Sequence, residues 1–369
     1  MFSEIFSESD HIEKVSRSLL VTDQEIRRCL SQSSFSVHDL VYLLSPAAKP
    51  YLEQLAQRSV MITRQRFGNV MQLFVPLYLS NECYNQCTYC GFSMEHDYER
   101  VTLNDEQIVK EAQYLSNKGF QHILLLTGES PKKVGVDYIS HAISLIRPYF
   151  SSIGIEVQPL SLQGYTSLME SGMDSLTLYQ ETYHTETYSK VHVSGLKRNY
   201  GNRLNAVEHA AEAGVYKINI GALLGLYDWR FDALSLASHL HYLQKKYWKV
   251  KYGVSFPRIQ EMYGKFLNHY PVSDSDLVQL ICAFRCVFPD LTITLSTRES
   301  AEFRDQVIPL GVSMVSAESN TSPGGYTQCD AEEQFSIHDT RSLTDICEML
   351  TTKQLEPMFK DWDREYVRG

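Results

Sequence analysis

The segment QLFVPLYLSNECYNQCTYCGF (residues 72–92) joins an apolar, β-rich run to a loop that holds three cysteines. Cys83, Cys87 and Cys90 have the spacing C-x3-C-x2-C. The rest of the chain has only five cysteines, and they are scattered: Cys29, Cys282, Cys286, Cys329 and Cys347. A loop with this spacing lets three thiolates approach one centre, so it predicts a functional site directly after a strand.

Short β-rich runs alternate with amphipathic helical stretches from about residue 71 onward. The predicted strands are 72–79, 122–128, 153–160, 175–183, 216–226, 251–258, 291–299 and 311–319. Eight strands that alternate with helices predict an α/β protein with a (β/α)8 barrel of the TIM type. A doubly wound open sheet is the alternative, although no G-x-G-x-x-G motif follows the first strand.

The chain is expected to have three parts. Residues 1–70 read as an N-terminal helical layer, residues 71–319 as the barrel, and residues 320–369 as a C-terminal segment packed on the barrel. Asn104 is expected to cap the helix after the first strand, with Gln107 three positions on.

Polar residues gather where the predicted strands end. They include Thr127, Gly128, Glu129, Gln158, Glu181, Arg258, Arg298 and Ser316. The C-terminal ends of the strands form the catalytic face of a barrel, and the cysteine loop follows a strand at the same end.

Composition restricts the class of protein. Hydrophobic residues make up 43% of the chain, which is enough for a real core, and a net charge of -10 argues against nucleic acid as a partner. The apolar run 123–126 is far shorter than the roughly 20 residues that span a bilayer. The acidic N-terminus has no apolar signal region, so a cytoplasmic, reducing setting is expected, in which crowded cysteines bind metal or catalyse.

Three cysteines leave open which group they bind. A structural zinc site takes four ligands, and Cys282 and Cys286, four apart on an apolar helix, read as core residues; His96 is a single histidine near the loop. A [4Fe–4S] cluster has four irons, so three cysteines leave one iron open for a substrate or cofactor. Three buried thiols without metal are the remaining alternative, disfavoured by the polar neighbours of the loop: Asn81, Glu82, Asn85 and Gln86.

The cysteine spacing, with aromatic Tyr89 before the last cysteine, resembles the radical S-adenosylmethionine (SAM) superfamily. In that superfamily the open iron is chelated by the methionine part of SAM, and the reduced cluster releases a 5′-deoxyadenosyl radical. Further motifs narrow the resemblance to the tyrosine lyases of thiamine thiazole synthesis, the 2-iminoacetate synthases: VPLYLSN, CTYCGFSM, LLLTGE, EVQPL, YQETYH, YGVSFPR, LSTRES, PGGY and the ending MFKDWD. The resemblance runs from about residue 40 to residue 363.

The resemblance implies a reaction and partners. A radical SAM lyase would cleave the Cα–Cβ bond of L-tyrosine to 2-iminoacetate and 4-cresol. A reduced flavodoxin or ferredoxin would supply electrons, and a thiazole synthase would be the protein partner. Neither a membrane nor nucleic acid is expected to take part.

The resemblance also assigns cofactor-binding residues. Cys83, Cys87 and Cys90 would hold the [4Fe–4S] cluster. The SAM-binding residues would be Tyr89 at the adenine, Thr127, Gly128 and Glu129 at the methionine amino group, and Glu181 and Arg203 at the ribose and carboxylate. Lys197 and Arg198 are alternatives to Arg203. A solvated loop acid is the alternative for Glu129, and a surface arginine the alternative for Arg203.

Substrate binding is assigned to Arg298, whose planar guanidinium suits a carboxylate, with Ser316 on the next strand adding a hydrogen bond. The alternative for Arg298 is a salt bridge to Glu299 or Asp305.

Four other functions compete with this assignment. The tyrosine lyase of hydrogenase maturation carries a second cysteine cluster near its C-terminus, whereas Cys329 and Cys347 are 18 apart and form no C-x2-C. A tryptophan lyase is a further relative. An electron-transfer iron–sulfur protein would want a fourth cysteine ligand. A SAM-binding regulator would bind the cofactor without turnover.

Overall fold

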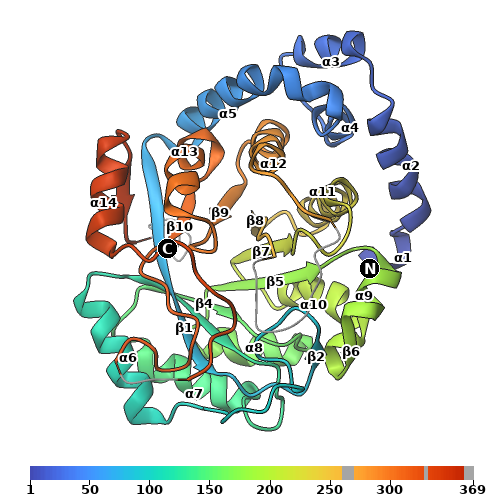
Figure 1. The fold of residues 1–369 in the computed structure, drawn as a ribbon. Helices are drawn as coiled ribbons and strands as arrows, with labels where there is room; N and C mark the ends of the chain where they lie inside the picture. The colour runs from blue at the N-terminus through green and yellow to red at the C-terminus, as the bar shows by residue number, and fades with distance from the viewer. Residues whose placement is uncertain (260–269, 328–330, 361–369) are drawn as a thin grey trace.

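The computed structural model describes residues 1–259, 270–327 and 331–360, so Cys329 and the end of the MFKDWD motif lie outside the described residues. Eight parallel strands form one sheet in which each strand pairs with the next and β10 pairs back with β1 (Figure 1). In order they are β1 (Val70–Ser80), β3 (His122–Thr127), β4 (Ser152–Glu156), β5 (Ser175–Glu181), β7 (Lys217–Ala222), β8 (Lys251–Ser255), β9 (Thr292–Leu295) and β10 (Met314–Ser316). The predicted barrel is confirmed, and the open sheet is wrong.

Helices follow the strands and surround the barrel (Figure 1). They are α6 (Asp105–Asn117), α7 (Val136–Ile146), α8 (Leu162–Ser171), α9 (Thr185–Val191), α10 (Tyr200–Glu212), α11 (Trp229–Lys246), α12 (Asp274–Val287), α13 (Ala301–Gly311) and α14 (Leu343–Thr352). The predicted cap of α6 is present, because Asn104 accepts a bond from the Gln107 amide and donates its own amide to the Gln107 side chain, both at 3.0 Å.

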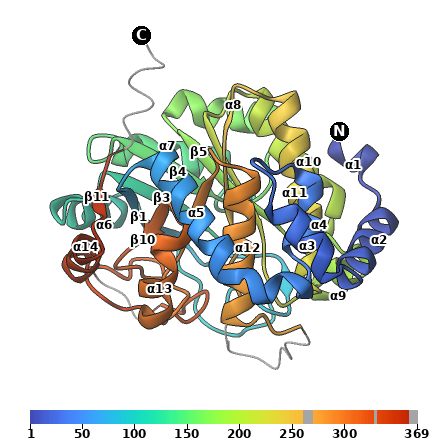
Figure 2. The same cartoon turned by 90° about the horizontal axis from the view of Figure 1, so that it is seen from above.

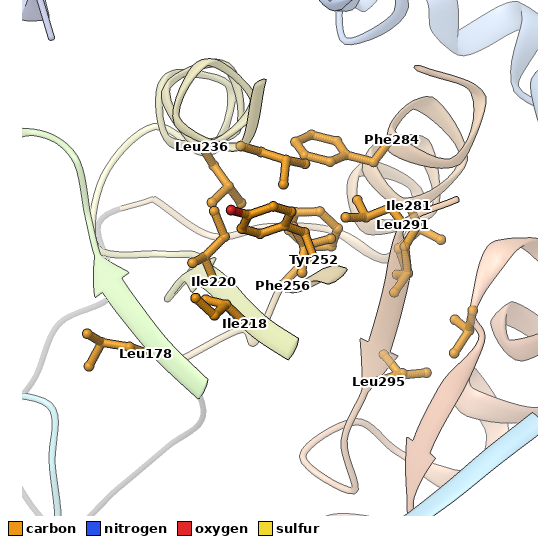
Figure 3. Packing of buried hydrophobic residues seen from close by; sticks show 14 of the residues in the cluster. Leu178, Ile218, Ile220, Leu236, Tyr252, Phe256, Ile281, Phe284, Leu291 and Leu295 are labelled. Atoms are coloured by element: carbon orange, nitrogen blue, oxygen red, sulfur yellow. The ribbon is translucent and has the colours of Figure 1, made fainter. Parts of the chain in front are cut away.

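The largest core lies between the strands and the helices that cover them. Ile218 and Ile220 of β7 pack beside Leu236 of α11, and Phe284 of α12 lies over Phe256 (Figure 3). Burying a side chain of this size contributes about 1.5–3 kcal/mol. This core fixes the positions of the strands, and so of the loops that follow them.

Helices before β1 cover one side of the barrel (Figure 2). They are α1 (Phe2–Ile5), α2 (Glu8–Leu19), α3 (Asp23–Leu30), α4 (Leu40–Leu43) and α5 (Leu52–Phe67), with 3-10 turns at Val37–Asp39 and Pro46–Tyr51. Helix α5 packs against α12 and α13, and α2 packs against α11. How the chain divides into domains stays a prediction.

The chain after β10 returns to the cysteine loop. The Gly91 amide donates to the Gln334 carbonyl at 3.0 Å, and a Cβ at Gly91 would overlap the Glu333 carbonyl oxygen. Farther on, β11 (Glu356–Met358) pairs in parallel with the start of β1. Within the described ranges, no helix has the length and apolar character that a membrane crossing requires.

Candidate active site

A cavity with about 910 Å³ of empty volume, including space open to solvent, lies where the barrel strands end. It is lined by ten of the predicted site residues: Cys83, Cys87, Tyr89, Cys90, Thr127, Gly128, Glu129, Glu181, Arg203 and Arg298. These residues come from strand ends, from the loops that follow the strands and from helix α10. The structure therefore brings them to one place, and only Ser316 of the predicted set lies outside this cavity.

The three loop cysteines are held beside a short antiparallel pair, β2 (Gln86–Cys87) with β6 (His192–Ser194). All three are free thiols. Among the described residues, no three His, Cys, Asp or Glu side chains are grouped as a single metal ion requires. In a four-iron cluster each thiolate binds a different iron, so the sulfurs need not meet at one point. Three thiols are one ligand fewer than a structural zinc site takes, and they match a cluster with one open iron.

Burial decides the protonation of these thiols. It raises the pKa of Cys90 to about 11, with nearby Cys83 adding to the effect. Burial likewise raises the pKa values of Cys83 and Cys87, and for Cys87 the nearby Lys197 opposes the shift. The thiols are therefore protonated at neutral pH, and iron binding must release their protons.

Tyr89 presents its ring to the cavity. Its hydroxyl is bonded to Nε2 of His192 at 2.7 Å, and the Lys197 ammonium lies 5.7 Å from the ring centroid. These contacts fix the ring plane at the cavity wall, next to the cysteines.

Two carboxylates and two cations form a buried network. Glu129 accepts from Arg203 at 2.7 Å and from Asn85 at 2.8 Å. Glu181 accepts from Lys197 at 2.7 Å and from Arg203 at 3.3 Å. Glu129 and Arg203 are only 9% and 6% exposed, so neither is the solvated surface group that the sequence left open.

Glu181 is held as an anion by this network. Burial alone would raise its pKa, but the adjacent Lys197 and Arg203 outweigh burial and lower it. The backbone of Glu181 has φ 71, at a register shift between β5 and β7. A non-glycine residue in this region costs on the order of 1 kcal/mol. Arg198, an alternative to Arg203, is exposed and bonds the Val193 carbonyl instead.

Thr127 and Gly128 form a polar cradle at the end of β3. The Thr127 hydroxyl is buried and has no hydrogen-bond partner within the described residues. The Gly128 amide donates to the Ser80 carbonyl at 2.9 Å, and a Cβ on this residue would overlap the Glu82 carbonyl oxygen. An unsatisfied hydroxyl in the cavity that Glu129 also lines suits a polar ligand.

Gly128→Ala is expected to lower the free energy of unfolding by about 1–3 kcal/mol, because the new methyl group forces the backbone away from Glu82. Thermal unfolding monitored by circular dichroism measures this. Gly201→Ala is the matched control, since its Cβ would meet nothing closer than an Asn199 side-chain oxygen at 4.0 Å. Equal melting temperatures for the two variants would contradict the close approach at Gly128.

A second cavity, with about 720 Å³ of empty volume, adjoins the first and contains Ser316 in its lining. The Ser316 hydroxyl accepts a bond from the Thr297 amide at 3.0 Å, so it also fixes the loop that carries Arg298. The Arg298 guanidinium lies 3.5 Å from the Phe335 ring centroid.

The salt-bridge alternative for Arg298 is wrong. Glu299 is paired with Arg258, with Nε and Oε1 2.9 Å apart. Asp305 is paired with Arg341 at 2.8 Å. Arg298 is therefore left to face the cavities.

Sequence reasoning missed several lining residues. Glu156 ends β4, so the polar strand-end signal could have found it. Lys197 was named only as an alternative. Gln334 and Phe335 come from the segment after the barrel, and no motif predicted their position.

An eight-stranded barrel with a free C-x3-C-x2-C loop and a polar cradle on its catalytic face defines a radical SAM enzyme. The model of the Radical SAM superfamily matches residues 77–236. The model of the Biotin and Thiamin Synthesis associated domain matches residues 255–356.

Comparison with curated proteins places the chain within this class. A 2-iminoacetate synthase from Escherichia coli (strain K12) is 47% identical over 344 residues, which are 93% of this chain and 91% of that protein. The Salmonella typhimurium 2-iminoacetate synthase is 46% identical over 344 residues, which again are 93% of this chain and 91% of that protein. The chain belongs to the 2-iminoacetate synthase family, as the motifs indicated.

Solved structures agree with the fold. The X-ray structure of the FeFe-hydrogenase maturase HydG from Carboxydothermus hydrogenoformans is 33% identical with a TM-score of 0.89, covering 96% of this chain and 84% of that one. Radical SAM enzymes use a [4Fe–4S] cluster and SAM, so these are the two cofactors of this chain.

Proposed function

We propose that this chain is a lyase that cleaves the Cα–Cβ bond of L-tyrosine to 2-iminoacetate and 4-cresol, for thiazole synthesis in thiamine formation. The observation that carries the proposal is the 47% identity to a 2-iminoacetate synthase over 93% of the chain. The adjoining cavities support it, because one is lined by the residues that would hold the cofactors and the other would accept the substrate.

The cofactors would be held by residues of the first cavity. Cys83, Cys87 and Cys90 would ligate the cluster, and the Thr127–Glu129 cradle would bind the methionine amino group. When bound, the cluster and SAM would supply the radical chemistry that acts on the substrate amine. Tyr89 would contact the adenine.

The charged network suits the rest of SAM. Arg203 is paired with both Glu129 and Glu181, and Lys197 is paired with Glu181, so two cations balance the two carboxylates. Its guanidinium would meet the SAM carboxylate, and Glu181 would accept bonds from the ribose hydroxyls. Because all three side chains are buried and mutually bonded, their positions are set before the ligand arrives.

The second cavity would hold tyrosine. Its lining mixes rings and aliphatic groups suited to an aromatic side chain: Phe74, Pro76, Tyr78, Leu124, Phe256 and Leu295. Arg298, which lines both cavities, would bind the substrate carboxylate, and Ser316 would add a hydrogen bond. Gln334 and Phe335 line both cavities and would help to exclude water from a reactive site.

Partners and location follow from the family resemblance. A reduced flavodoxin or ferredoxin would donate electrons to the cluster, and a thiazole synthase would receive the iminoacetate. The reaction would take place in the cytoplasm.

Anaerobic incubation with SAM, a reductant and L-tyrosine is expected to give 5′-deoxyadenosine and 4-cresol together. Mass spectrometry of the products, with and without tyrosine, measures this. The cresol must disappear when tyrosine is omitted. Indole-derived fragments from tryptophan, with no cresol from tyrosine, would instead show a tryptophan lyase. SAM binding without any product would show a regulator.

A further inference from the structure

Two charged side chains stand at the boundary between the cavities. Among the described residues with charged side chains, the first cavity is lined by Glu129, Glu156, Glu181, Lys197, Arg203 and Arg298, and the second by Glu156, Arg298 and Glu299. Only Glu156 and Arg298 line both. A molecule that reaches from the second cavity into the first would pass these two charged side chains.

The barrel sets these two residues on opposite walls. Glu156 ends β4, the third of eight barrel strands, and Arg298 follows β9, the seventh. Strands four places apart in a closed eight-stranded barrel face each other across its axis. The two side chains are close enough for the Arg298 charge to lower the pKa of Glu156.

Neither side chain has a charged partner in the described part of the chain. Glu129 and Glu181 are each paired with cations, and Glu299 is paired with Arg258. The Glu156 carboxylate and the Arg298 guanidinium make no hydrogen bond or ion pair there, and the guanidinium lies over the Phe335 ring. Half-buried charges without partners are costly, so a ligand that satisfies both would bind strongly here.

We infer that Glu156 binds the α-ammonium group of the substrate while Arg298 binds its carboxylate, so that the pair recognises both ends of an amino-acid zwitterion. The inference rests on the proposed function and adds a residue that selects amines over deaminated acids. The Glu156 carboxylate can also accept one ammonium proton: an N–H bond breaks, an O–H bond forms and the electron pair stays on nitrogen. This leaves the neutral amine beside the cofactor cavity.

The charge state of Glu156 makes substrate binding depend on pH. Burial, with Glu181 adding to it, raises the pKa of Glu156 to about 7, against the opposing effects of nearby cations. The groups that face it are Tyr78 on β1, Tyr179 and Glu181 on β5, Lys197, Arg203 on α10 and Arg298. Below this pKa the carboxylic acid is neutral and attracts the ammonium less. Tyrosine affinity should therefore fall as pH drops from 8 to 6.

Equilibrium dialysis of the anaerobic holoenzyme tests the inference. Two labelled ligands are compared, L-tyrosine and 3-(4-hydroxyphenyl)propanoate, which lacks only the amine. At pH 8, Glu156→Gln is expected to weaken tyrosine binding by about 10–100-fold and to leave the propanoate affinity unchanged or higher. Tyrosine binding by the variant should no longer change between pH 8 and 6. Glu170→Gln, at an exposed position of α8, is the control with the same loss of charge.

The inference is overturned if Glu156→Gln binds tyrosine within about twofold of the wild type, or loses both ligands equally. The inference is also overturned if the affinity of the wild type for tyrosine is the same at pH 8 and pH 6. This measurement needs no variant. Glu156→Asp keeps the charge and should keep the pH dependence. Failure of the proposed function looks different, because the wild type would then form no cresol at all.

Discussion

Replacement of Cys87 by alanine is expected to remove the iron–sulfur cluster and to reduce tyrosine cleavage by on the order of 10³-fold or more, the scale on which loss of an essential group acts. Cys87 lies in the first cavity with Cys83 and Cys90, and no other described cysteine lines that cavity. A lost thiolate therefore has no substitute. Iron content after anaerobic reconstitution, and cresol formation, measure the effect. Cys83→Ala and Cys90→Ala should each remove the cluster and cresol formation as well.

The matched controls are Cys282→Ala and Cys286→Ala. Both residues are buried in α12, so they act as core residues. Burial raises the pKa of each thiol to about 12. These variants are expected to lose some stability and to keep about four irons per chain. Zinc at one ion per chain in anaerobic wild-type protein, without iron, would contradict the cluster assignment.

Arg298→Lys is expected to keep the cluster and SAM binding but to lose cresol formation by about 10²-fold. A lysine keeps the charge, yet it cannot hold both carboxylate oxygens in one plane as a guanidinium does. The reacting amine would then move relative to the cofactor. Release of 5′-deoxyadenosine should continue without cresol, because SAM cleavage does not use this group. The ratio of the two products is the measurement.

Arg28→Lys, at an exposed position of α3, is the control for the same chemical change far from the cavities. It should leave the product ratio unaltered. Near-normal cresol output from Arg298→Lys would show that Arg298 does not hold the substrate. A loss of iron in that variant would show that the residue supports the fold instead.

The barrel could be predicted because its signals are local. Each strand is a short apolar run such as 122–127, and α6 begins at a cap formed by residues three positions apart. The cysteine loop is likewise a single segment with its own spacing. The strand-end polar residues followed from barrel geometry, which places all such ends on one face.

The charge pairing in the site could not be predicted in the same way. Arg203 and Glu129 are 74 positions apart, and their contact depends on how α10 packs beside β5 and β7. Phe335 reaches Arg298 from a segment without a recognisable pattern. The free charge of Glu156 became apparent only once the partners of Glu129, Glu181 and Glu299 were known.

The central claim is that this barrel breaks the Cα–Cβ bond of tyrosine. L-Tyrosine labelled with ¹³C at Cβ, incubated anaerobically with the holoenzyme, SAM and a reductant, tests it most directly. Nuclear magnetic resonance of the products should place the whole label in the methyl group of 4-cresol and none in the two-carbon product. Label in the two-carbon product, or in an aromatic product other than cresol, would contradict the account.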